Sequence, residues 1–171
     1  MDFLALLHPQ IVHTPIVMLI VGLAFELVGL ATRKDWWRRA AFVMLLLGAL
    51  GAGAAVLSGR PTGEVAERSG VPEQAVDTHE ERAMVVLWLA VSALVVRAVA
   101  ALLRRGRRLI TALALALWLA AAVAVGLAAH SGGQLVFQHG AAVHAPARSV
   151  AAPGRPDARG TQPARETPDR D

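Results

Sequence analysis

Long runs of apolar residues alternate with short polar segments along the chain. Each run is about long enough to cross the roughly 30 Å hydrocarbon core of a bilayer as a helix. An open chain can satisfy its backbone hydrogen bonds there only as a helix. The predicted spans are Ile11–Ala31, Ala40–Ser58, Ala83–Leu103 and Leu109–Ala129. The pattern therefore predicts an all-α fold, an integral membrane four-helix bundle, with the transmembrane domain over residues 1–144.

The last part of the chain has a different composition. Residues 145–171 are rich in Ala, Pro, Arg, Gly and Asp and contain few large apolar side chains. Such a segment cannot bury enough apolar surface to offset the entropy lost on ordering. We therefore expect a disordered C-terminal tail.

The polar connections between the spans differ in charge. The first, "TRKDWWRR", and the third, "RRGRR", are rich in Lys and Arg, whereas the second, Gly59–Arg82, has three arginines and six acidic residues. Short connections rich in Lys and Arg stay in the cytoplasm. The predicted location is the bacterial cytoplasmic (inner) membrane, with the N-terminus, the second connection and the C-terminal tail outside. No basic region precedes the first apolar run, which favours an anchor over a cleaved signal peptide.

The overall composition agrees with a membrane protein. Of the 171 residues, 55% are hydrophobic and 18% are charged, whereas soluble domains carry about 25% charged residues. The absence of cysteine excludes disulfides and thiolate metal sites. Much of the basic excess lies in the first and third connections, so it marks orientation. We expect the lipid bilayer as a partner and no nucleic acid.

The two halves of the chain follow a similar order, which suggests an internal repeat. Each half has a polar entry, a span, a basic turn, a second span and an end rich in small residues. The entries are "HTP" (His13–Pro15) and "THEE" (Thr78–Glu81), and the exits are "AAVLSGR" (Ala54–Arg60) and "LAAHSGG" (Leu127–Gly133). A duplication would relate two helix hairpins by a pseudo-two-fold axis along the membrane normal, with the first and third spans diagonally opposed. The similarity is short and partly compositional, so the alternative is coincidence.

Helix-end signals place three histidines at one level. His13–Pro15 has the pattern of a helix start, and Thr78–Glu81 has that of a capping box. Gly132 and Gly133 form a predicted helix stop directly after His130. On the predicted topology, His13, His79 and His130 therefore lie at the outer ends of three helices.

These histidines are the candidate ligands. His139 follows the glycines and is positioned to fold back over the other three. Imidazole is a common ligand of metals and of haem iron, and helix bundles hold cofactors between facing helices. We therefore consider His13, His79, His130 and His139 as ligands of haem b or a transition metal. The alternative is that they cap helices and bind water or headgroups at the interface.

Two charged residues fall inside the predicted spans. Glu26 in the first span and Arg97 in the third lie at similar depth. Charges within a membrane are costly and are usually paired or functional. We expect an ion pair that holds the two helices together. The alternative is that Arg97 extends to the surface and Glu26 takes part in a proton path.

Two end motifs resemble a known family. "LHPQIVHTPIVML" (Leu7–Leu19) and "HSGGQLVFQHG" (His130–Gly140) are similar to the opening and closing motifs of the domain-of-unknown-function 2231 family of bacterial multi-pass membrane proteins. The matching positions are His8, Pro9, Val12, His13, Pro15, Ile16, Gly132, Gly133, Leu135, Val136, His139 and Gly140. Thr14 and Phe137 are mild departures. The resemblance implies a four-helix protein, and related domains joined to Rieske or cytochrome modules imply a redox setting.

The sequence leaves two functions open. The first is a redox or metal- or haem-binding membrane subunit with redox partner proteins. The second is a cofactor-free structural or anchoring protein. No nucleophile–base pair, phosphate loop or paired carboxylates are present, which favours a non-enzymatic role. Either function is compatible with a homo- or hetero-oligomer.

Overall fold

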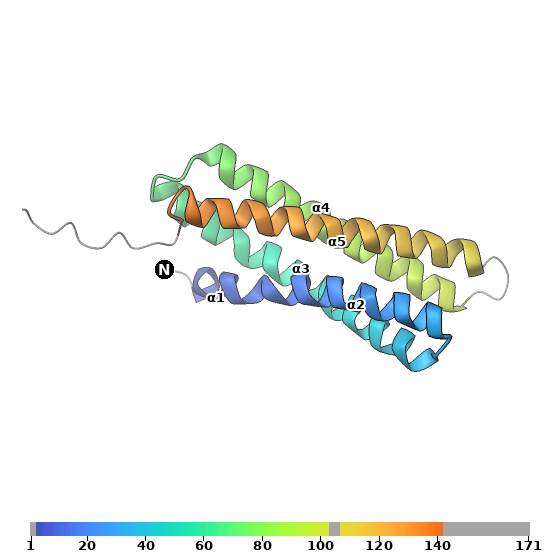
Figure 1. Ribbon diagram of the computed structural model, residues 1–171. Helices are drawn as coiled ribbons and strands as arrows, with labels where there is room; N and C mark the ends of the chain where they lie inside the picture. The colour runs from blue at the N-terminus through green and yellow to red at the C-terminus, as the bar shows by residue number, and fades with distance from the viewer. Residues whose placement is uncertain (1–2, 103–106, 142–171) are drawn as a thin grey trace, which may run out of the picture.

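The computed structural model describes residues 3–102 and 107–141, and all regular structure in them is helical (Figure 1). The predicted tail, 145–171, lies outside the described residues. The helices are α1 (Phe3–Ile11), α2 (His13–Thr32), α3 (Asp35–Arg68), α4 (Glu73–Leu102) and α5 (Arg107–Phe137).

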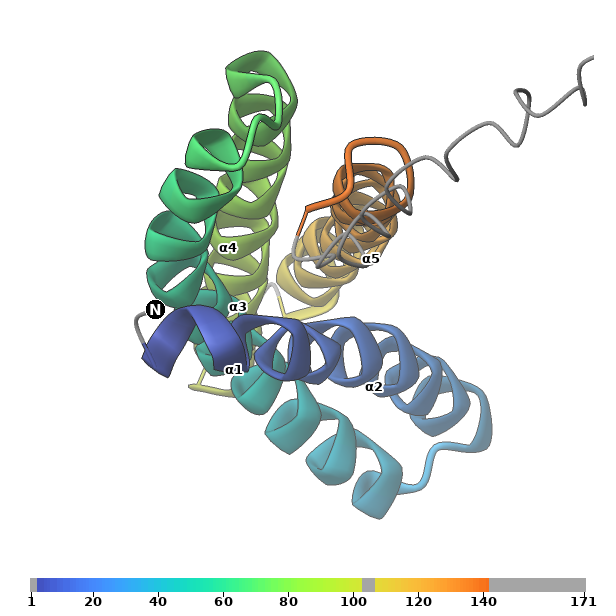
Figure 2. The same cartoon turned by 90° about the vertical axis from the view of Figure 1, so that its left-hand side faces the viewer.

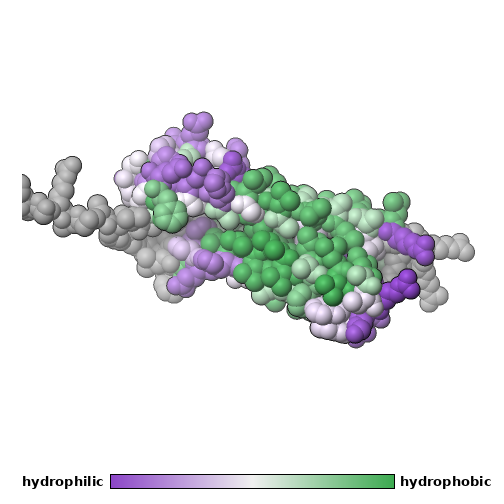
Figure 3. Space-filling view, in the orientation of Figure 1, coloured by the Kyte–Doolittle hydropathy of each residue, from purple (hydrophilic) through white to green (hydrophobic). Residues whose placement is uncertain are grey.

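Four helical segments are long and apolar enough to cross a membrane, and the first of them joins the end of α1 to α2. This confirms the predicted fold class. The four segments are Leu7–Thr32, Asp35–Arg68, Glu73–Leu102 and Arg108–Phe137. Their large apolar side chains face outward as well as inward. Leu57 and Leu109, for example, are 71% and 77% exposed. Figure 3 shows apolar residues forming a broad band between two polar ends, the surface that a bilayer requires.

The helices form two packed hairpins. α2 packs against α3, and α4 packs against α5; the hairpins meet where α3 contacts α4 and α2 contacts α5. α2 and α4 therefore lie at opposite corners of the bundle, as the repeat predicts, and Figure 2 shows this arrangement from one end. Below, the end that carries the α3–α4 connection is called the α3–α4 end, and the opposite one the α2–α3 end.

The core in the middle of the bundle is filled by both large and small side chains. Leu19 and Leu45 fill one hairpin, whereas Ala90 and Trp118 fill the other, and all four are fully buried or nearly so. The Trp118 indole N–H donates to the Leu19 carbonyl at 2.9 Å. This bond satisfies the single polar atom of a large core side chain, so it fixes how the hairpins fit together.

The predicted second connection is wrong, because most of Gly59–Arg82 is helical. α3 continues to Arg68 and α4 begins at Glu73, so only four residues connect them. At about 1.5 Å per residue, the 34 residues of α3 are longer than a bilayer core is thick. Both helices therefore continue into the polar region beyond the apolar band at the α3–α4 end, which Figure 3 shows in the orientation of Figure 1.

A glycine turn ends α3. Gly70 has a φ of +94°, and its N–H donates to the Glu67 carbonyl, while the Val71 N–H donates to the Ala66 carbonyl. This is the Schellman arrangement, in which a left-handed glycine satisfies the last carbonyl groups of a helix. Val71 and Ala66 also belong to a small buried cluster with Val76 and Ala141, so the projecting hairpin has an apolar centre of its own.

The predicted helix ends need three further corrections. α2 begins at His13 after the helical Val12, because the short α1, which the sequence did not predict, precedes it. Thr78 is no N-cap, since it lies within α4, where its hydroxyl donates to the Gln74 carbonyl. α5 continues through Gly132 and Gly133 to Phe137, because these glycines adopt ordinary helical geometry.

The turn after α5 forms at a later glycine. Gly140 has a φ of +69°, and its N–H donates to the Val136 carbonyl. The Ala141 N–H donates to the Leu135 carbonyl. The left-handed conformation that suits glycine therefore falls at Gly140, after His139.

Burial repeats between the hairpins. The buried positions of α2 are Pro15, Leu19, Gly22, Leu23, Glu26 and Gly29. Those of the membrane part of α4 are Val86, Ala90, Ala93, Arg97 and Ala100. Each of these α4 positions lies 71 residues after a buried α2 position, the interval between Glu26 and Arg97. Among the buried α2 positions, Leu23 lacks such a counterpart. In the same way, buried α3 positions Ala41, Leu45, Gly48, Ala52, Ala55 and Ser58 correspond to Ala114, Trp118, Ala121, Val125, Ala128 and Ser131 of α5. The two halves of the chain thus share a pattern of buried positions as well as the order of their elements.

Candidate functional site

A histidine of α4 is held by a serine of α5 at the α3–α4 end. The His79 Nδ1 lies 3.1 Å from the Ser131 Oγ, and the Ser131 hydroxyl donates to the Ala128 carbonyl at 2.9 Å. Ser131 is 4% exposed and His79 is partly buried. A Cβ on Gly132 would lie only 3.0 Å from the His79 Cε1, so a glycine is what lets the ring approach α5.

The same arrangement occurs in the first hairpin. The His8 Nδ1 lies 2.9 Å from the Ser58 Oγ, and the Ser58 hydroxyl donates to the Ala55 carbonyl at 3.1 Å. A Cβ on Gly59 would lie 3.2 Å from the His8 Cε1. Each histidine thus rests over a glycine that directly follows the serine that holds it.

The two histidine–serine pairs are equivalent in the repeat. His8 and His79 are separated by the same 71 residues as Glu26 and Arg97, and the serines are separated by the interval that relates α3 to α5. The structural repeat therefore matches His79 with His8, whereas the order of polar entries along the chain predicted a match with His13.

The hydrogen bonds define which nitrogen of each ring carries the proton. A serine hydroxyl has one hydrogen, and in both pairs it is donated to a backbone carbonyl. With that hydrogen on the carbonyl, the oxygen accepts from the histidine, and we infer that Nδ1 carries the proton. In the neutral ring, Nε2 then holds a lone pair, which is the form that binds a metal.

Each Nε2 lies beside the glycine under its ring, since a Cβ on Gly59 would be 3.9 Å from the His8 Nε2 and one on Gly132 would be 3.6 Å from the His79 Nε2. In the described part of the chain, neither Nε2 has a hydrogen-bond partner. Every fully enclosed polar side-chain atom in the described residues has a hydrogen-bond partner. Each Nε2 therefore keeps some exposed surface in the described structure.

The other candidate histidines are placed differently. His13 is exposed, and its Nδ1 lies 2.7 Å from the Pro9 carbonyl of the preceding turn. His130 and His139 are exposed as well. Across residues 3–102 and 107–141, no three His, Asp or Glu side chains lie close enough together to hold a metal ion. The structure therefore does not gather the four candidate histidines, and their role as ligands stays a prediction.

His139 lines a polar cleft beside the His79–Ser131 pair. The cleft has a volume of about 340 Å³ and lies between the start of α4 and the end of α5. Thr78, Arg82 and Gln134 also line it, and Ser131 forms part of its wall. His139 thus lines the same cleft as the serine that positions His79.

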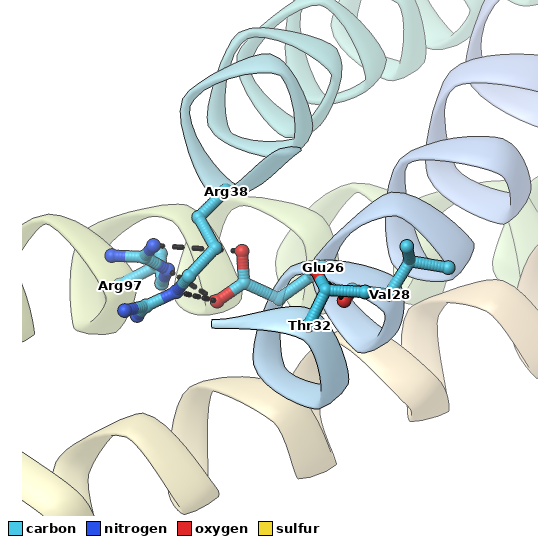
Figure 4. Close-up of polar contacts among 5 residues, drawn as sticks. All are labelled: Glu26, Val28, Thr32, Arg38 and Arg97. Atoms are coloured by element: carbon cyan, nitrogen blue, oxygen red, sulfur yellow. Dashed lines mark hydrogen bonds and ion pairs between the residues drawn. The ribbon is translucent and has the colours of Figure 1, made fainter. Parts of the chain in front are cut away.

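The ion pair expected inside the membrane is present at the α2–α3 end (Figure 4). The Glu26 carboxylate is fully buried and accepts from the Arg97 Nε at 3.2 Å. Arg38, which lies in the basic first connection of the predicted topology, donates its Nε to the same oxygen at 3.4 Å. One carboxylate thus joins α2, α3 and α4.

Sequence reasoning missed His8, both serines and Arg38 as parts of these sites. His8 lies outside the predicted first span and next to no helix-end signal. The dipeptide "SG" occurs as Ser58–Gly59, Ser69–Gly70 and Ser131–Gly132, and its presence at both exits is the signal that could have found the serines. These exits are "AAVLSGR" and "LAAHSGG", where small residues are also typical of helix ends.

The fold and these contacts define a class: a membrane protein of two equivalent helix hairpins with polar residues at both ends of its bundle. The chain belongs to the DUF2231 family of predicted membrane proteins, whose family model matches residues 5–145. This confirms the resemblance. No curated protein and no solved structure matches the chain.

Proposed function

We propose that the protein is a membrane subunit that binds haem b or a transition metal at its α3–α4 end, with His8 and His79 as the central ligands. The observation that carries the proposal is the pair of equivalent imidazoles at one end of the bundle, each held at Nδ1 by a serine. Two equivalent imidazoles would together hold haem iron or a transition-metal ion.

The serines support this proposal. Ligating histidines almost always donate their second nitrogen to an oxygen that fixes the ring. Ser58 and Ser131 occupy this position, and their own hydroxyl hydrogens are used within their helices. The bound group would supply one-electron redox chemistry. The chain would hold the two rings in one tautomer and limit their rotation.

The remaining candidates have secondary roles in this proposal. His139 lines the cleft beside the His79–Ser131 pair and would shield the bound group, whereas His13 and His130 are expected at the rim. Redox partner proteins and an oligomeric assembly belong to the same proposal.

The test is an absorption spectrum of the purified full chain in detergent, oxidised and reduced, with metal analysis. The protein is produced in cells supplied with haem and iron. We expect a Soret band that shifts on reduction, or a stoichiometric transition metal. A chain with neither would exclude the proposal.

A cofactor-free structural role is the second candidate. It is favoured by the fact that each histidine already makes a contact between helices, since His8 ties α1 to α3 and His79 ties α4 to α5. On this alternative, His8→Ala and His79→Ala lower the thermal stability of the protein and change no spectrum. Loss of a bound cofactor in either variant excludes it.

A further inference from the structure

Two guanidinium groups lie side by side at the α2–α3 end. Figure 4 shows Arg38 and Arg97 on the same side of the Glu26 carboxylate. Arg38 comes from the start of α3, and Arg97 from the last turns of α4. Their side chains are 18% and 9% exposed, so both are removed from most solvent.

The position of Arg38 is built into the packing. A Cβ on Gly29 would lie 2.5 Å from the Arg38 Cγ and 3.1 Å from the Trp37 Cβ. The Arg38 stem therefore crosses α2 directly over a glycine. A side chain that is enclosed in this way holds its guanidinium in one place.

The charges of this cluster do not cancel. Two arginines, which stay protonated in proteins, face one carboxylate, so the cluster carries a net positive charge even when Glu26 is ionised. Like charges at short distance in a poorly solvated site repel strongly. An anion bound beside the two guanidinium groups would remove this excess.

Donors for such an anion remain. Glu26 accepts only the Nε of Arg38, and from Arg97 it accepts the Nε and one terminal nitrogen. The other terminal nitrogens have no hydrogen-bond partner within the described residues. Every fully enclosed polar side-chain atom there does have a partner, so these nitrogens are not fully enclosed. These nitrogens are therefore accessible from outside the bundle.

We propose that Arg38 and Arg97 bind the phosphate group of an anionic phospholipid at the α2–α3 end. The guanidinium fork matches the geometry of phosphate oxygens. Arg97 lies five residues before the end of α4, so about 8 Å of helix separates it from the helix end. Its long side chain and that of Arg38 can therefore place their charged groups near the headgroup layer.

A neighbouring residue offers a matched control. Arg39 follows Arg38 in α3 and is exposed, and it has no contact with Glu26 in the described structure. A general attraction between basic residues and anionic lipid would depend on both arginines alike. Binding at the site formed by Arg38 and Arg97 depends on Arg38 and not on Arg39.

The test is native mass spectrometry of the full chain in detergent with added phosphatidylglycerol, compared with zwitterionic phosphatidylcholine. We expect the wild-type protein to retain phosphatidylglycerol preferentially, and Arg38→Gln to retain about fivefold less. Arg39→Gln should stay close to wild type. Arg38→Lys keeps the charge but loses the fork, so it should fall between.

Three results would overturn the proposal. The first is equal retention of the two lipids by the wild-type protein, a comparison that does not depend on any variant folding. The second is an equal loss in Arg38→Gln and Arg39→Gln. The third is displacement of phosphatidylglycerol by an equal concentration of inorganic phosphate, which would assign the site to the free anion.

Discussion

The protonation of two histidine rings follows from the direction of two serine hydroxyls. Ser58 and Ser131 lie within hydrogen-bond distance of backbone carbonyls, from which we infer that each donates there and accepts from its histidine. In water, a neutral histidine exchanges its proton between both nitrogens. Here, one proton position is selected before any ligand arrives.

The selected tautomer can be measured directly. Replacing Ser131 with alanine removes the acceptor of His79, so the proton should move in part from Nδ1 to Nε2. ¹⁵N spectra of histidine-labelled protein, recorded about one and a half pH units above the ordinary histidine pKa, report the two forms. Ser69→Ala, which changes an exposed serine at the end of α3, should leave the spectrum unchanged. An unaltered His79 signal in Ser131→Ala would refute the assignment.

The Glu26 carboxylate is the second residue with a defined energetic role. Glu26→Leu leaves two largely buried guanidinium groups without their acceptor, so we expect a loss of about 3–5 kcal/mol in the free energy of unfolding. Glu64→Leu is the control, because Glu64 pairs with Arg68 on an exposed surface and should cost less than about 1 kcal/mol. Denaturant unfolding in detergent measures both, and equal losses would contradict the structural role of Glu26.

At the scale of the helix, two adjacent glycines of α5 differ in their surroundings. A Cβ on Gly132 would lie 3.0 Å from the His79 ring, whereas a Cβ on Gly133 would meet nothing within 4 Å. Glycine lowers the stability of a helix interior. Gly132 is thus required by a close approach, and Gly133 is not.

The contrast gives a matched pair of variants. Gly133→Ala should raise the free energy of unfolding by about 0.5–1 kcal/mol. Gly132→Ala should lose this gain, because the new methyl group displaces the His79 ring from Ser131. Thermal unfolding compares them, and the ¹⁵N histidine spectrum shows whether the ring has moved. Equal stabilisation with unchanged spectra would show that the ring does not need the glycine.

The lengths of the helices show what hydropathy can predict. The apolar runs located all four spans, because burial in a bilayer requires apolar residues over a fixed length. They did not show that α3 and α4 continue into Gly59–Arg82, because a polar sequence is equally able to form a helix in water. The end of α3 was readable at Gly70 and Pro72, since a glycine followed closely by proline is a helix stop.

The site was harder to predict than the spans for a related reason. The ion pair of Glu26 and Arg97 could be expected, because charges in apolar runs are few and must be paired. The contact of His8 with Ser58 joins residues 50 positions apart, and neither departs from its surroundings in composition. Only the packing of α1 against α3 brings them together.

At the scale of the molecule, two equivalent hairpins have acquired different residues at corresponding places. Glu26 and Arg97 occupy one such pair of positions, and Leu45 and Trp118 another. The charge difference is complementary, since Glu26 and Arg97 attract each other across the two hairpins. The divergence therefore favours the pairing of unlike hairpins.

The orientation in the membrane is a prediction about the whole molecule. The basic α2–α3 end should face the cytoplasm, and the acidic helical projection should face outward. Because the chain has no cysteine, single replacements can be labelled without background. On intact cells, an impermeant maleimide should react with Glu67→Cys in the projection but with Lys34→Cys only after permeabilisation. The opposite pattern would reverse the topology.

The most direct test of the proposed function compares cofactor content in three variants with that of the wild-type protein. His8→Ala and His79→Ala each remove one central ligand, whereas His13→Ala removes an exposed histidine near the same end. We predict that the wild-type protein and His13→Ala carry a Soret band or a stoichiometric metal, and that His8→Ala and His79→Ala lose it while remaining folded. A wild-type protein without haem or metal, or a cofactor that survives both central replacements, would contradict the account.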